Sequence, residues 1–182
     1  MKKVVLLLTA LLSLLLLVGI AAASDVAITS VGQSPDGMMV KVLMKRLKIE
    51  PDYDALMKPG TLSGQKVLIA VVGGSSKGLG AAGIDKEEEK ARALSLIEEA
   101  KGKGMKVIVM HVGGDGRRGD LSDMFIEAAT PLGDRVIVVR SGNGDGIFTK
   151  SKAASAELIE VEKVQDATAP LDAAFKEWGV EK

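Results

Sequence analysis

Two kinds of apolar pattern alternate along the chain. Short runs such as 67–72, 107–110 and 136–139 are continuously apolar and rich in Val and Ile. The segments between such runs repeat apolar residues every three or four positions. Continuous runs are typical of parallel strands covered on both faces, and the longer repeat is typical of amphipathic helices. We therefore predict strands over 26–31, 66–72, 106–110, 135–139 and 158–161, and helices over 35–47, 86–101, 121–129, 147–156 and 169–178.

Helix-start signals support several of these boundaries. Ser34 precedes a proline at the start of the first predicted helix and is the expected N-cap there. Asp85 and Glu88 have the spacing of a capping box, and Asp120 and Asp123 repeat it. The strand–helix alternation predicts an α/β fold, with a three-layer, doubly wound, mainly parallel five-stranded sheet of the flavodoxin-like or Rossmann-like type.

The first 23 residues have the pattern of a secretory signal peptide. Lys2 and Lys3 precede a Leu-rich run over 4–20, and small residues at 21–23 form an A-x-A cleavage site. We predict cleavage near Ala23/Ser24, which leaves a single α/β domain over 24–182 in the periplasm or outside the cell. An uncleaved anchor is the alternative, because the run is about long enough to span a bilayer.

Composition narrows the possible functions. The chain has no Cys, which excludes disulfides, thiolate metal sites and thiol nucleophiles. Its 24 basic residues equal its 24 acidic ones and only 3% of residues are aromatic, so we expect no nucleic-acid partner. One His and scattered Asp residues predict no metal site. Free nucleotide cofactors are scarce outside the cytoplasm, and we expect no cofactor.

Glycines gather in the loops that follow the first four predicted strands, over 32–37, 73–83, 113–119 and 142–146. In an open α/β sheet these loops lie at the carboxyl ends of the strands, where helix N-termini and bare backbone amides converge on ligands. The alternative is that these glycines only form tight turns. The loops at the opposite edge also need turns but hold far fewer glycines, so we predict a ligand site at the glycine-rich edge.

Polar side chains in these loops suit a small polar, anionic ligand. Lys77, Arg117 and Arg118 offer positive charge, whereas Gln33 and Asn143 can fix orientation by hydrogen bonds. The predicted ligand-binding residues are Gln33, Ser34, Gly74, Ser75, Ser76, Lys77, His111, Gly114, Arg117, Arg118, Asn143 and Asp145. We therefore predict an exported binding protein whose partners are this ligand and a membrane transporter or another envelope protein. A solvated loop charge is the alternative role of each basic residue.

Three motifs offer enzymatic alternatives. G-S-S-K-G at 74–78 fits a nucleophile elbow with Ser76 as nucleophile and His111 as base, although this histidine lies in the next strand-end loop and not at the end of a triad. The run at 73–80 looks like the cofactor loop of short-chain dehydrogenases, but Tyr53, the only tyrosine, precedes it. G-G-D-G at 113–116 resembles a loop of NAD and diacylglycerol kinases, but Arg117 stands where they have Thr. A hydrolase using Ser76 with His111, or an interaction domain for an envelope protein, remains the alternative function.

Four segments carry a resemblance that covers nearly all of the chain after the leader. They are I-T-S-V-G-Q-S-P-D at 28–36, K-G-L-G-A-A-G-I-D at 77–85, G-R-R-G-D-L-S-D at 116–123 and G-N-G-D-G-I-F-T-K at 142–150. Together they resemble a family of small exported bacterial proteins classed as a domain of unknown function. The resemblance implies an extracytoplasmic α/β domain and no established activity.

Overall fold

A computed structural model describes residues 24–181 of the chain, so the predicted signal peptide lies outside the described residues. The sheet has six strands, namely β1 (Val26–Val31), β2 (Asp52–Tyr53), β3 (Val67–Val72), β4 (Lys106–His111), β5 (Arg135–Val139) and β6 (Glu157–Val161). The helices are α2 (Asp36–Arg46), α3 (Ser76–Ala82), α4 (Lys86–Gly102), α5 (Asp120–Ala129), α6 (Ile147–Ser151) and α7 (Thr168–Glu177). Within residues 24–181, no helix is long and apolar enough to cross a membrane.

All neighbouring strands of the sheet are parallel, in the order β2-β1-β3-β4-β5-β6. The chain runs outward from β1 to β2, and then returns past β1 to continue in the other direction from β3. β1 and β3 therefore flank the point at which the strand order reverses, which we call the switch point. Ligands of open α/β sheets bind beyond the carboxyl ends of the strands at such a point.

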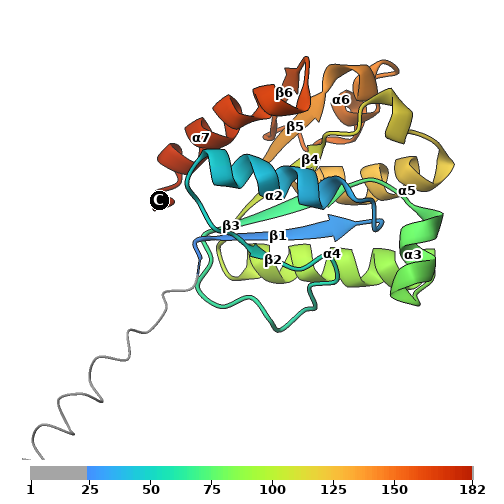
Figure 1. Cartoon of the computed structure of the whole chain (residues 1–182), viewed down its shortest axis with the longest axis horizontal. Coiled ribbons are helices and arrows are strands. Elements are labelled where there is room, and N and C mark those ends of the chain that lie inside the picture. Colours follow the sequence, from blue (N-terminus) through green and yellow to red (C-terminus); the bar gives the residue numbers. More distant parts are fainter. Residues whose placement is uncertain (1–23, 182) are drawn as a thin grey trace, which may run out of the picture.

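Two hydrophobic clusters cover the two faces of the sheet. One packs α2 and α7 against alternate strand residues such as Val26, Ile28 and Ile69. The other packs α4, α5 and α6 against the intervening residues, such as Ala27 and Leu68. Figure 1 shows α2 and α4 on opposite sides of β1. This arrangement confirms the predicted three-layer α/β fold, and it explains why the central strands are continuously apolar.

The structure adds one strand and one α-helix that the apolar pattern did not predict. β2 makes the sheet six-stranded instead of five-stranded; it consists of two residues that pair with Ala27 and Ile28 at the edge, which is too short for a recognisable strand pattern. α3 contains two glycines and resembles a loop in sequence. Its N-terminus is capped by Ser75, whose Oγ accepts a hydrogen bond from the N–H of Gly78 at 3.0 Å.

Helix starts agree only partly with the predicted caps. The Asp85–Glu88 capping box forms, with Asp85 Oδ1 accepting from the N–H of Glu88 at 2.8 Å and Glu88 Oε2 accepting from the N–H of Asp85 at 3.0 Å. Asp120 is not an N-cap, because α5 begins at this residue and Gly119 takes the cap position. The helix predicted over 147–156 ends at Ser151, since the backbone of Lys152 is extended.

We expect Asp85→Ala to lower the free energy of unfolding by about 1 kcal/mol, because α4 loses its side-chain cap. Urea denaturation measures the change. Glu98→Ala, an exposed acid in the middle of the same helix, is the matched control and should stay within about 0.5 kcal/mol of the wild type. Equal losses in the two variants would contradict the assigned capping role.

Candidate functional site

Backbone hydrogen bonds join the loops that follow β1 and β3 at the switch point. Gln33 and Gly74 form an isolated antiparallel bridge. On one side of it, the N–H of Ser34 donates to the carbonyl of Gly73 at 3.1 Å, and on the other the N–H of Ser75 donates to the carbonyl of Gly32 at 2.8 Å. The two loops therefore continue the contact between β1 and β3 beyond the sheet, and their backbones close the space between these two strands.

Several glycines of this edge are required by close packing inside the protein. A Cβ atom on Gly32 would lie 2.6 Å from Phe125 Cδ2, and one on Gly74 would lie 2.6 Å from Leu121 Cγ. By contrast, Gly80 has open space around it. Part of the glycine enrichment that predicted a ligand site therefore serves the approach of loops to α5.

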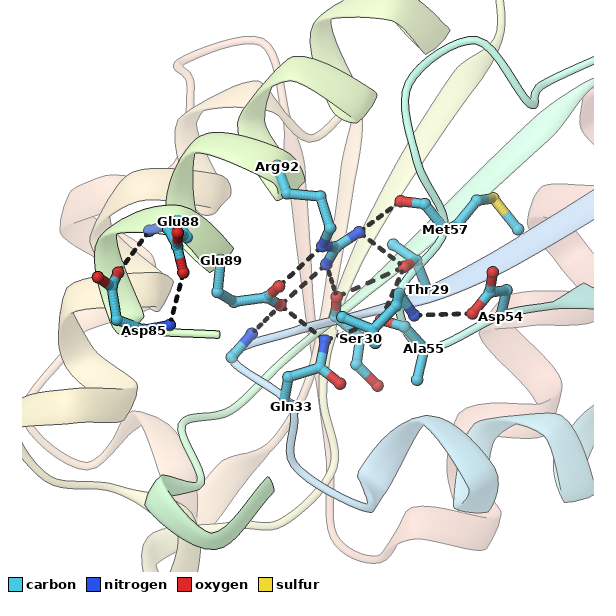
Figure 2. Close-up of polar contacts among 12 residues, drawn as sticks. Thr29, Ser30, Gln33, Asp54, Ala55, Met57, Asp85, Glu88, Glu89 and Arg92 are labelled. Carbon is cyan, nitrogen blue, oxygen red and sulfur yellow. Dashed lines mark hydrogen bonds and ion pairs between the residues drawn. The ribbon is translucent and has the colours of Figure 1, made fainter. Parts of the chain in front are cut away.

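A buried ion pair on α4 fixes the carboxyl end of β1 (Figure 2). Glu89 accepts hydrogen bonds from the N–H of Gly32 and from Gln33 Nε2, both at 2.9 Å. Gln33 Nε2 also donates to the carbonyl of Ala55 at 2.9 Å, and the backbone of Gln33 adopts a positive φ of 60°. The amide N–H groups of Gln33 thus bind the protein itself, in the position where we predicted contacts to a ligand.

Arg92 completes this cluster, and every N–H group of its guanidinium donates a hydrogen bond. Its Nε and one Nη2 hydrogen contact Glu89, with an Nε–Oε2 distance of 2.7 Å. The other three hydrogens reach the carbonyls of Met57 and Ser30, both at 2.6 Å, and Thr29 Oγ1 at 3.3 Å. A guanidinium has five N–H donors, and all five are used here. The cluster is therefore structural, and sequence analysis missed it although Glu89 falls on the buried face of α4.

A second, very different pair joins the loops after β1 and β4. Asp36, the first residue of α2, is 1% exposed, and its Oδ2 atom has no hydrogen-bond partner among the described residues. Its Oδ1 atom lies 3.5 Å from Nε of Arg117, whose side chain is 42% exposed. Arg117 ends the short 3-10 helix η1 (Asp115–Arg117). The pair therefore joins a buried carboxylate to a guanidinium that is partly exposed to solvent.

Glycines surround the free oxygen of Asp36. A Cβ atom on Gly113 would lie 2.7 Å from Oδ2, and one on Gly73 would lie 3.5 Å from it. Asp36 therefore points between the loops that follow β3 and β4. The burial of Asp36 is not visible from the sequence pattern, because an acid in the first turn of a helix is usually exposed.

Arg118, by contrast, is bound by two carboxylates. It contacts Asp123 through Nε at 2.6 Å and Asp145 through Nη2 at 2.8 Å, and it donates to the carbonyl of Gly142. Hydrogen bonds from the guanidinium hold the pKa values of both aspartates below their usual range, and Asp123 in turn raises the pKa of Arg118. Arg118 and Asp145, both predicted ligand residues, instead brace the loops after β4 and β5 against each other.

His111 and Asn143 are buried braces of the same edge. His111 Nδ1 lies 3.0 Å from the carbonyl oxygen of Val72, and its Nε2 lies 3.0 Å from that of Gly114. Asn143 Nδ2 donates to Glu160 Oε1 at 2.7 Å. Both ring nitrogens of His111 face carbonyl oxygens, and within residues 24–181 the imidazole makes no hydrogen bond to Ser76.

The remaining predicted residues fall into two groups. Ser34 is buried and Ser75 caps α3, so both act in the local fold. Ser76 and Lys77 are exposed on α3 and make no hydrogen bond or ion pair through their side chains among the described residues. The structure therefore brings the predicted residues to one edge of the sheet, but most of them bind one another.

The larger surface hollows lie away from Asp36. One of about 650 Å³ lies between Pro59 and Ala91 of α4, and another of about 640 Å³ lies at the opposite edge of the sheet beside Lys106 and Trp178. Neither Asp36 nor Arg117 lines either of these hollows.

Comparison with known proteins gives one match. A family model described as a domain of unknown function (DUF6305) matches residues 23–175, which is most of the chain. The searches of curated proteins and of solved structures found no match to the chain.

We expect Arg92→Met to lower the free energy of unfolding by about 3–5 kcal/mol, because it leaves the Glu89 carboxylate buried without its counter-charge. The double variant Glu89→Gln/Arg92→Met should recover part of this loss, since no unpaired charge remains and Gln can still accept from Gly32. Denaturant unfolding checks both, with Arg46→Met, an exposed arginine of α2, as control. A double variant no more stable than Arg92→Met would show that the charge is not the cause.

We expect the stabilising effect of Asp123 to depend on pH. Its folded-state pKa is lowered, so its carboxylate stabilises the fold above the ordinary Asp pKa of about 4, and this contribution disappears as pH falls through the folded value. Asp123→Asn should therefore be less stable than the wild type at neutral pH, and the difference should shrink below about pH 4. Urea titrations at both pH values measure it, and a constant difference would refute the prediction.

Proposed function

The chain belongs to the family described as a domain of unknown function (DUF6305), and we propose that it binds a small polar, anionic ligand at the carboxyl edge of its sheet. We further propose that it does so outside the cytoplasm. The observation that carries the proposal is the Asp36–Arg117 pair, because it combines a buried carboxylate with a half-exposed guanidinium close to the switch point.

Arg117 is the residue best suited to meet the anionic group. Arg118 is already neutralised by Asp123 and Asp145, whereas Arg117 has one loose ion pair at 3.5 Å that meets no hydrogen-bond geometry. No hydrogen bond between Arg117 and Asp36 has to be broken when the Arg117 side chain rotates toward a ligand. A guanidinium can then bind a carboxylate or phosphate through two parallel hydrogen bonds.

The surrounding backbone favours the same class of ligand. α2 begins at Asp36 and α5 begins at Asp120, so two helix N-termini face this edge. Each N-terminus carries a partial positive charge and N–H groups without partners inside the helix. A small anion beside Arg117 would therefore gain from backbone as well as side-chain interactions.

Export rests on the sequence alone. The A-x-A site at 21–23 and the apolar run before it support a cleaved leader. A binding protein of this size outside the cytoplasm would pass its ligand to a membrane transporter or to another envelope protein, which we propose as its partner.

The two other functions find less support. A hydrolase would need His111 to reach Ser76, but both ring nitrogens of this buried histidine contact carbonyl oxygens. An interaction domain would use exposed apolar residues, and Met38, Met39 and Val42 do lie on the outer face of α2. These three residues form one exposed apolar strip of a single helix, whereas the Asp36–Arg117 pair joins two loops at the carboxyl edge.

We expect at least one small carboxylate or phosphate metabolite to raise the thermal midpoint of the wild-type protein. Arg117→Ala should weaken binding of that compound by about 10- to 100-fold, which is the usual effect of losing a hydrogen bond to a charged group. Thermal shift followed by calorimetry measures both quantities. Arg46→Ala is the control and should bind as the wild type does. The absence of stabilisation by any compound of a broad anion panel would refute the proposal.

A further inference from the structure

Asp36 is a buried carboxylate that the fold does not use. It is 1% exposed, yet its Oδ2 atom has no hydrogen-bond partner among the described residues. Buried carboxylates normally accept several hydrogen bonds, and one left without them destabilises a fold. Pro35 takes the N-cap position of α2, and Ser34 Oγ accepts from the N–H of Asp36 at 3.4 Å, so the Asp36 carboxylate does not cap the helix that it begins. A residue that breaks a local rule with no gain in stability is typical of a functional site.

The free oxygen lies between two loops, beside glycines that leave room for it. Gly113 and Gly73 have no Cβ, and a Cβ on Gly113 would collide with both Asp36 Oδ2 and the Cβ and Cγ atoms of Arg117. Gly113 therefore allows Arg117 to lie over Asp36. The contact of 3.5 Å is held by charge and not by a hydrogen bond, so the guanidinium covers the carboxylate without satisfying it.

Charge balance determines which ligand group could take the place of the Arg117 guanidinium beside Asp36. When Arg117 turns to bind the anionic group of a ligand, Asp36 loses the one ion pair that it makes within residues 24–181. Burial then leaves a carboxylate with an unpaired oxygen and no cation, which is strongly unfavourable. A hydroxyl group could donate one hydrogen bond but would bring no charge. An ammonium group brings both.

We propose that the ligand is a zwitterion, a small amino acid whose carboxylate binds Arg117 and whose ammonium group donates to Asp36 Oδ2. This inference rests on the proposed function and names the ligand class of the same site. Asp36 is the residue that selects amino acids over simple acids, because a compound without a cation leaves its carboxylate unpaired.

Matched compounds test the proposal directly. Calorimetry compares alanine, propionate and lactate, then leucine, 4-methylpentanoate and 2-hydroxy-4-methylpentanoate, then aspartate, succinate and malate. We expect the amino acid of at least one set to bind at least tenfold more tightly than both of its analogues. In Asp36→Asn this preference should fall to less than threefold, and in Arg117→Ala the same amino acid should lose at least tenfold in affinity.

Two controls separate the role of Asp36 from an effect on folding. Glu98→Gln makes the same carboxylate-to-amide change at an exposed acid of α4 and should bind as the wild type does. Asp36→Asn should not lower the thermal midpoint, because Asn carries no buried charge. A marked drop in that midpoint would show that Asp36 stabilises the fold and would overturn the assignment.

The remaining outcomes distinguish the two proposals. Simple acids that bind with Arg117-dependent affinity but without preference for an ammonium group would overturn the zwitterion and leave the proposed function standing. Hydroxy acids that bind as tightly as amino acids would replace charge selection with donor selection and so contradict this inference. Failure of every amino acid and every acid to bind would overturn both.

Discussion

The ion pair of Glu89 and Arg92 positions the end of the sheet on which the candidate site is built. It connects α4 to the last residues of β1, to the loop after β1 and to the segment after β2, so four parts of the chain meet at one buried charge pair. Such a pair is favourable only if hydrogen bonds satisfy its remaining donors and acceptors. Here all five donors of Arg92 are used, and the positive φ of Gln33 is held by its own side-chain contacts to the same cluster.

The Asp36–Arg117 pair differs from the Glu89–Arg92 pair in how fully its polar atoms are hydrogen-bonded. Both pairs join an acid and an arginine near the carboxyl end of β1, but one is complete and the other leaves a buried oxygen without a partner. The complete pair fixes the backbone of the loop after β1, and α2 begins a few residues later with Asp36. A rigid loop can hold an unsatisfied carboxylate in place, whereas a flexible loop would turn it out to water. The structural cluster thereby allows the incomplete pair to persist.

Prediction from sequence succeeded where a single physical cause dominates a segment. The apolar runs at 67–72, 107–110 and 136–139 are strands because both faces of a parallel sheet are covered, and the Asp85–Glu88 box forms because its atoms are local in the chain. β2 and α3 were missed, since two edge residues and a glycine-containing turn of helix carry no periodic signal. Gly119 replaces Asp120 as a cap, a one-residue difference that spacing alone does not resolve.

By itself, the sequence determined the α/β class, most of the strands and helices, and the edge of the sheet that collects glycines and polar residues. Only the tertiary structure decided the use of each side chain at that edge. Hydrogen bonds to partners distant in sequence hold Gln33, Arg118, His111 and Asn143. Burial, by contrast, leaves one oxygen of Asp36 without a hydrogen-bond partner among the described residues. The physical reason is that apolar periodicity reports which face of an element is covered, whereas hydrogen-bond satisfaction depends on which loops meet in space.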